Sequence, residues 1–247
     1  MVKASWPLPR VVTHRCGGTL APENTLIGLE FTLAHHVAAV EFDVMLSGEG
    51  TPIVIHDEDL LRTTGQPGVV AQAADAEILQ RDAGRWHSAR FAGERIPLFA
   101  DAIVRCRALG IVANVEIKPA EGFDVATGEA AARLAAKGWL GAQAQPLLSS
   151  FSPVALQAAM NVAPELPRAL LVDAVPEDFA AAVAAVGGVG LVCNGRRLDA
   201  ATIVRVKTAG LGLGIYTEND PERARQLLDW GVDSVITDRP DLLAHLA

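Results

Sequence analysis

Three carboxylates stand in the sequence where they could share one metal ion. Glu41 and Asp43 are separated by one residue, and Glu116 belongs to a second short apolar run. If both runs are strands, Glu41 and Asp43 point to the same side, because side chains alternate along a strand. Three converging carboxylates repel one another unless a cation neutralises them. The pattern predicts a divalent cation on Glu41, Asp43 and Glu116, and oxygen-only ligands favour Mg²⁺ or Ca²⁺ over zinc.

Two histidines could carry the proton transfers of a hydrolysis. His14 and His56 each follow an apolar run. An imidazole titrates near pH 6.5, at about neutral pH, so one ring can accept a proton while the other donates one. Ion pairs with Arg15 or Lys118 would explain the Glu-x-Asp pair taken alone. The third carboxylate and the two histidines together favour a catalytic site.

Short apolar runs that alternate with helical patterns must position these residues. Such alternation is typical of βα units around a parallel sheet, and one (β/α)8 barrel needs about 250 residues. For a chain of 247 residues we predict an α/β fold, a somewhat irregular TIM-type barrel in one domain over residues 1–247. Nine runs compete for eight strand positions: 10–15, 39–45, 52–56, 112–118, 146–151, 168–173, 190–194, 212–217 and 233–238.

Which of the nine runs lies outside the barrel is left open, although the second and third runs are joined by a few residues without a helix. The carboxyl ends of barrel strands form the active face, so the polar clusters that end four of the first runs should meet at one mouth. Residues 57–97 are too long for an ordinary connection in a compact barrel. We predict that they form a small insertion or lid after the third strand.

Helix signals separate the strands. Asp220-Pro221-Glu222 reads as an N-cap, a first-turn proline and an acid that suits the helix dipole, and Gly231 predicts the end of that helix. Ser152-Pro153 repeats the start signal. In the first helix, the apolar stripe predicted to face the sheet consists of Leu26, Leu29, Leu33 and Val37.

Composition restricts the partners. A formal net charge of −8 works against binding to nucleic acid or to an anionic membrane surface. The most apolar stretch, 179–193, is shorter than the roughly 20 residues of a membrane span, and residues 1–12 lack a secretory apolar core. Three cysteines at wide spacing suit a reducing compartment. We expect a cytoplasmic protein. Whether two copies of the chain form a homodimer is left open.

The ordered motifs of the chain resemble the glycerophosphodiester phosphodiesterase family, most of all its short cytoplasmic bacterial members. The match spans nearly the whole chain. The motifs are His14-Arg15, Ala21-Pro22-Glu23-Asn24-Thr25, Glu41-Phe42-Asp43, His56-Asp57, Arg62-Thr63-Thr64, Asp82-Ala83-Gly84, Glu116-Ile117-Lys118-Pro119, Ser149-Ser150-Phe151, Tyr216-Thr217-Glu218-Asn219 and Ile236-Thr237-Asp238-Arg239-Pro240.

The resemblance implies metal-dependent hydrolysis of small glycerophosphodiesters, such as glycerophosphocholine or glycerophosphoethanolamine, to sn-glycerol 3-phosphate and an alcohol. It implies attack by the substrate's own glycerol hydroxyl and a cyclic phosphate that water opens. It makes His14 the general base and His56 the general acid. The remaining assignments are Glu41, Asp43 and Glu116 for the metal, Arg15 and Lys118 for phosphate, and Glu23, Asn24, Phe151 and Tyr216 for substrate.

Two departures and three alternatives accompany this interpretation. Cys16 stands where the family usually has glycine, and Tyr216 replaces a frequent tryptophan, which affects leaving-group preference more than catalysis. A related barrel phosphodiesterase acting on lysophospholipids or phosphoinositides would need a hydrophobic rim. A metal-dependent enolising lyase with Lys118 as its base would leave the histidines without a role, as would a non-catalytic binding barrel.

Overall fold

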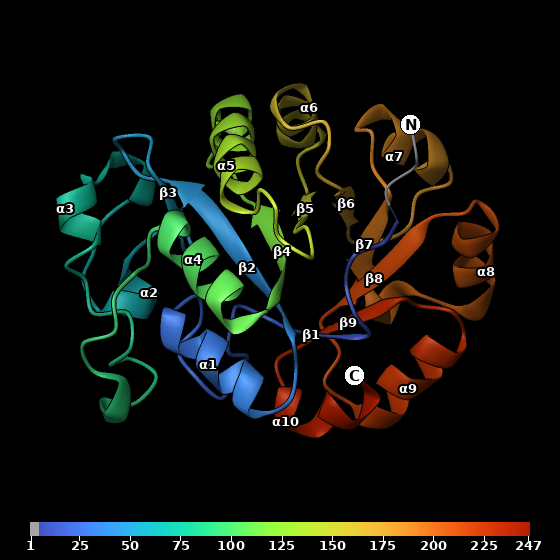
Figure 1. Cartoon of the computed structure of the whole chain (residues 1–247), viewed down its shortest axis with the longest axis horizontal. Coiled ribbons are helices and arrows are strands. Elements are labelled where there is room, and N and C mark those ends of the chain that lie inside the picture. Colours follow the sequence, from blue (N-terminus) through green and yellow to red (C-terminus); the bar gives the residue numbers. More distant parts are fainter. Residues whose placement is uncertain (1–4) are drawn as a thin grey trace.

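The computed structural model describes residues 5–247, in which eight parallel strands close into a barrel (Figure 1). The ring runs β1-β9-β8-β7-β6-β5-β4-β2 and closes where Thr13 of β1 pairs with Val40 of β2. Its strands are β1 (Val11–Thr13), β2 (Ala39–Leu46), β4 (Val112–Ile117), β5 (Leu147–Ser150), β6 (Arg168–Val172), β7 (Gly190–Asn194), β8 (Gly212–Tyr216) and β9 (Ser234–Thr237). The predicted TIM-type barrel is confirmed.

The surplus strand is β3 (Pro52–Val54), which lies outside the ring. It pairs antiparallel with β2, with Val54 opposite Val44 and Pro52 opposite Leu46. The connection is a tight turn in which Gly50 has a φ of 80°. Because so short a turn can only reverse the chain, β3 cannot become a parallel barrel strand, which needs a long crossover. The irregularity predicted at this point is the hairpin.

Helices surround the strands, as Figure 1 shows. They are α1 (Leu26–Ala34), α4 (Phe99–Leu109), α5 (Asp124–Gly138), α6 (Pro153–Val162), α7 (Phe179–Ala185), α8 (Ala200–Thr208), α9 (Pro221–Asp229) and α10 (Pro240–Leu243). The predicted caps are confirmed, because Asp220 accepts hydrogen bonds from the first amides of α9 and Ser152 accepts one in α6. Among the helices of residues 5–247, none is long and apolar enough to cross a membrane.

The predicted apolar stripe of α1 is wrong at Leu33, and Val37 lies beyond the end of the helix at Ala34. Leu33 is 38% exposed, whereas the buried residues of the helix are Gly28, Leu29 and Thr32. A Cβ at Gly28 would lie 2.9 Å from the Cβ of Cys16, so only glycine allows α1 to approach the loop after β1 this closely. Thr32 donates a hydrogen bond to the carbonyl of Cys16. The helix therefore packs through small residues, which a count of apolar side chains does not find.

Residues 57–97 form a packed unit between β3 and α4. Their helices are α2 (Leu61–Thr64) and α3 (Asp75–Ile78), with 3-10 turns η1 (Val70–Gln72) and η2 (Ala89–Phe91). Leu60, Val70 and Ile78 are buried against Met45 and Ile53 of the β2–β3 hairpin. In Figure 1 α2 and α3 lie at one side of the molecule, near β3. A role of this unit as a lid stays a prediction.

The base of the barrel is apolar. Val12, Leu147, Val192 and Ile236 belong to one buried cluster inside the ring, on which Trp6 packs. The indole of Trp6 donates a hydrogen bond of 2.8 Å to Ser234 Oγ. Polar interior residues therefore concentrate toward the carboxyl ends of the strands, where the predicted site lies.

Candidate active site

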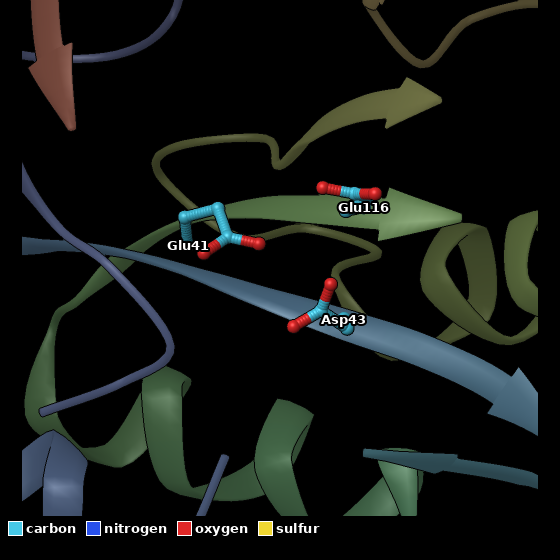
Figure 2. A group of neighbouring side chains, drawn as sticks. All are labelled: Glu41, Asp43 and Glu116. Carbon is cyan, nitrogen blue, oxygen red and sulfur yellow. The ribbon is translucent and has the colours of Figure 1, made fainter. Parts of the chain in front are cut away.

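Glu41, Asp43 and Glu116, here called the acid trio, converge inside the barrel (Figure 2). One carboxylate oxygen from each lies within 4.8 Å of the others. The register explains the convergence, because Asp43 of β2 pairs directly with Glu116 of β4, and Glu41 is on the same inward face as Asp43. Glu41 and Asp43 are 2% and 1% exposed. The predicted grouping of these three carboxylates is therefore present.

The electrostatics of the acid trio call for a cation. Burial raises the pKa of Glu41 well above its usual range, and the charges of Asp43 and Glu116 raise it further. Burial and the charge of Asp43 raise the pKa of Glu116 to about 8, against the opposing effect of Lys118. Glu41 Oε1 is buried and finds no hydrogen-bond partner within residues 5–247. Close, desolvated oxygens of this kind are the ligands that a hard divalent cation prefers.

His14, just beyond β1, is held by a carboxylate from the other end of the chain. Its Nδ1 lies 2.7 Å from Asp238 Oδ1, and Asn219 donates a hydrogen bond of 3.1 Å to Asp238 Oδ2. Burial alone would raise the pKa of Asp238, but the hydrogen bond and charge of His14 lower it. An ionised carboxylate can only accept, so Nδ1 of a neutral His14 carries the proton. Its Nε2, 3.8 Å from Glu41 Oε2, is left as the proton acceptor.

His56, which follows β3, has the same kind of support. Its Nδ1 lies 2.6 Å from Asp57 Oδ1, and Arg62 donates a hydrogen bond to Asp57 Oδ2. The hydrogen bond from Arg62 holds the pKa of Asp57 well below its usual range. Burial lowers the pKa of His56, while Asp43 and Asp57 oppose that effect. In both histidines Nδ1 is thus held by a carboxylate, and Nε2 does not take part in that contact.

Two cations border the acid trio. Lys118 Nζ lies 4.0 Å from Asp43 Oδ1, and Arg15 Nε lies 3.8 Å from Asp43 Oδ2. Arg15 has a φ of 47° and also donates its backbone N–H to Glu41 Oε2 at 3.0 Å. The left-handed turn after β1 therefore brings a positive side chain and a backbone donor to the same carboxylates.

These residues line one cavity of about 520 Å³. Phe151 and Tyr216 form an apolar wall, with ring centroids 5.9 Å apart and planes at 80°. The Tyr216 hydroxyl donates to the carbonyl of Val172 at 3.1 Å, and burial raises its pKa to about 12. Of the predicted site residues, the lining contains His14, Arg15, Glu41, Asp43, His56, Glu116, Lys118, Phe151 and Tyr216.

Glu23 and Asn24 are not among the residues that line this cavity. Asn24 is 4% exposed, and its amide donates to Asp43 Oδ2 at 2.9 Å. Glu23 accepts from both Arg62, at 2.7 and 2.8 Å, and Arg15, at 3.1 Å. Each side chain thus contacts a charged residue that lines the cavity, and a role of Glu23 and Asn24 in substrate binding stays a prediction.

Sequence reasoning missed the supporting residues Asp57, Arg62, Asn219 and Asp238. All four lie within motifs quoted above, but the motifs did not assign them a partner. Asp238 is separated from His14 by 224 residues and reaches it only because β1 and β9 are neighbours in the ring. The carboxylate that directly follows His56 in the sequence was the signal that could have found Asp57.

The model of the glycerophosphoryl diester phosphodiesterase family matches residues 14–242, which is nearly the whole chain. This chain belongs to that family. The family's enzymes use a divalent metal, and the acid trio could bind one. Cys16, the departure from the family's usual glycine, has a φ of 70°, a backbone conformation that favours glycine. Its side chain is 1% exposed and packs in the core against α1, so burial offsets part of the backbone strain.

Solved and curated family members agree with this assignment. The structure of a phosphodiesterase from Oleispira antarctica in complex with the product sn-glycerol-3-phosphate is 33% identical, with a TM-score of 0.93 and coverage of 97% of this chain and 98% of that one. The glycerophosphodiester phosphodiesterase of Bacillus subtilis is 29% identical over 94% of this chain and 84% of its own length. That of Caldanaerobacter subterraneus is 28% identical over 96% of both chains.

Proposed function

We propose that this family member hydrolyses small glycerophosphodiesters, such as glycerophosphocholine and glycerophosphoethanolamine, to sn-glycerol 3-phosphate and an alcohol. The observation that carries the proposal is one cavity in which the acid trio meets two histidines, each paired with a carboxylate. The product in the Oleispira antarctica relative supports glycerol phosphate as the part of the substrate that the site binds.

Glu41, Asp43 and Glu116 would hold one divalent cation, Mg²⁺ or Ca²⁺. The residues fit such an ion, since their oxygens are close, desolvated and partly unpartnered within residues 5–247. When bound, the cation supplies positive charge to the phosphoryl oxygens in the transition state. Arg15 and Lys118 add charge on the same side, so a globally acidic protein can hold an anionic substrate locally.

His14 is the proposed general base and His56 the proposed general acid. Nε2 of His14 is free to take the proton from the attacking hydroxyl of the glycerol group, because Nδ1 donates to Asp238. Protonated His56, oriented by Asp57, donates to the oxygen of the leaving alcohol. In the second half of the reaction, water opens the cyclic phosphate. Phe151 and Tyr216 give that cavity an apolar side for the glycerol carbons or the leaving group.

A direct assay tests the proposed function. The purified protein is incubated with glycerophosphocholine, and release of sn-glycerol 3-phosphate is measured with and without a chelator. We expect turnover that the chelator abolishes and that added Mg²⁺ or Ca²⁺ restores. Cleavage of lysophosphatidylcholine in preference to glycerophosphocholine would instead support the lysophospholipid alternative.

Lys118 should act through its charge. Lys118→Met should lower kcat/KM by roughly 10²–10³-fold, as for other groups that stabilise transition-state charge. Lys118→Arg keeps the charge near Asp43 and should stay within about tenfold of the wild type, because only the donor geometry changes. Kinetics of both variants check this. Complete loss in Lys118→Arg would favour a lysine that moves a proton, as in an enolising lyase.

Asp57 should set the pH range in which His56 is protonated. Its hydrogen bond raises the pKa of His56, against the lowering caused by burial. In Asp57→Ala the pKa of His56 should fall, so the alkaline limb of the kcat/KM profile should move to lower pH by roughly one unit. Asp59→Ala is the matched control, since within residues 5–247 the Asp59 side chain accepts a hydrogen bond only from the backbone of Leu61. A profile of Asp57→Ala that overlays the wild type would remove His56 from the acid role.

We also propose a cytoplasmic location. Cys16, Cys106 and Cys193 are buried and free in the described chain, as expected for a protein kept in a reducing compartment.

A further inference from the structure

The side chain of a buried asparagine under the acid trio has no hydrogen-bond partner within residues 5–247. Asn114, in β4, is 1% exposed and lines the cavity. Neither Oδ1 nor Nδ2 finds a partner in the part of the chain that the structure describes. Rotating the amide cannot correct this, because both of its atoms are affected. An unpaired buried polar group destabilises the fold, so such a residue at this position needs a ligand to explain it.

Two further side chains on the strands that flank β4 also have polar atoms that are unpaired in the described part of the chain. Asn114 pairs with Glu41 in the β2–β4 register, and it points inward because it lies two residues before Glu116 on the same strand. Ser149 of β5 pairs with Glu116 and shares its inward side with Leu147, a residue of the barrel interior. Ser149 Oγ and Glu41 Oε1 both lack a partner within residues 5–247. Three adjacent strands thus direct polar atoms that are unpaired within residues 5–247 into the same part of the barrel interior.

We propose that Asn114 holds one water molecule, together with Ser149 and Glu41, and that this water is a ligand of the divalent cation. The inference rests on the proposed metal site. A buried water typically makes about three hydrogen bonds, and these groups supply an amide, a hydroxyl and a carboxylate oxygen. It therefore gives one atom of each of the three groups a hydrogen-bond partner.

The position of Asn114 favours a water over direct ligation. The amide belongs to the same layer of the barrel as Glu41, one layer below the Asp43–Glu116 pair. It also has a shorter side chain than Glu41, which bends toward the other two carboxylates in Figure 2. Mg²⁺ and Ca²⁺ need about six or more oxygen ligands, and three carboxylates leave positions for waters and substrate. Asn114 would hold one of those waters.

Metal titration of the wild type and of Asn114→Leu tests the inference without an activity assay. Isothermal calorimetry with Mg²⁺ should show a Kd that is roughly 10- to 100-fold higher in Asn114→Leu. The thermal midpoint of the metal-free variant should not fall, because leucine removes the unpaired amide at similar volume. Thr13→Val is the matched control. Thr13 also has a buried, unpaired hydroxyl within residues 5–247, but shares the outward side of β1 with Val11, so its Kd should be unchanged.

Europium luminescence counts the waters on the ion. With Eu³⁺ as the probe, decay rates in H₂O and D₂O should give a count lower by about one water in Asn114→Leu than in the wild type. Should Asn114→Leu not fold, Ser149→Ala removes a second holder of the same water. Its Mg²⁺ Kd should rise by roughly 2- to 10-fold, the effect of one hydrogen bond.

The outcomes separate this inference from the proposed function. Unchanged Mg²⁺ affinity in Asn114→Leu overturns the inference, and so does lower affinity with an unchanged water count. Glu116→Gln is titrated in parallel. If Glu116→Gln binds Mg²⁺ as the wild type does, the proposed metal site itself fails; if it loses binding while Asn114→Leu keeps it, only the role of Asn114 fails.

Discussion

Replacing His14 with alanine should lower kcat for glycerophosphocholine by roughly 10²–10⁴-fold, the usual contribution of a general base. His14 is half-buried at the rim of the cavity, so its removal leaves the barrel intact. Circular dichroism and a thermal melt check the fold, and steady-state kinetics measure the loss. His245→Ala is the control, because His245 is exposed and contacts only Arg225 through its side chain among the hydrogen bonds of residues 5–247.

A substrate whose leaving group needs no proton distinguishes the general acid from the general base. His56→Ala should also lose roughly 10²–10⁴-fold on glycerophosphocholine. On glycerophospho-p-nitrophenol most of that loss should disappear, since nitrophenolate leaves without a proton. His14→Ala should stay impaired on both substrates, because the attacking hydroxyl must still lose its proton. The opposite pattern would exchange the roles of the two histidines, and near-normal rates in either variant would end the acid–base assignment.

Replacing Glu116 with glutamine should raise the Kd for the divalent cation by more than about 100-fold, because even a residue that only supports a ligand contributes 10- to 100-fold. Turnover at low metal concentration should fall with it. The metal-free variant should melt at the same temperature as the wild type or higher, since one of three crowded carboxylates is gone.

Calorimetric titration and metal-free melting curves check both parts of that expectation. Glu129→Gln on α5 removes one carboxylate that pairs with Arg133 at the surface, and it should leave the Kd unchanged. A Glu116→Gln variant with normal metal affinity but no activity would mean that Glu116 contacts substrate and that the cation, if any, binds elsewhere.

The strands and the acid trio could be predicted because local pattern determines them. Each apolar run marked a strand, and the alternation of side chains was enough to place Glu41 and Asp43 on one face. The composition of β3 does not give its direction, but the short connection after β2 does, since so few residues can only reverse the chain. Leu33 was expected in the core and is exposed, because the contact face of α1 is made by Gly28 and Thr32.

The supporting residues of the site depend on which strands become neighbours. Asn24 and Glu23 were predicted to bind substrate, which stays a prediction, and their contacts with Asp43 and Arg62 were not predicted. Likewise, Asn114 appears in the sequence as one polar residue in an apolar run. Its importance emerges only when the register sets it against Glu41 and leaves its amide unpaired within residues 5–247.

The rates at which the three thiols are alkylated can report local opening of the barrel. Burial raises the pKa of Cys106 in α4 and of Cys193 in β7 to about 12, and raises that of Cys16 well above its usual range. Alkylating reagents attack the exposed thiolate, so each site is labelled only after its surroundings open. The amide of Cys16 donates to the carbonyl of Glu41, which couples this thiol to the acid trio. Labelling of Cys16 should therefore slow most when Mg²⁺ is added, giving mass spectrometry a local measure of cation binding.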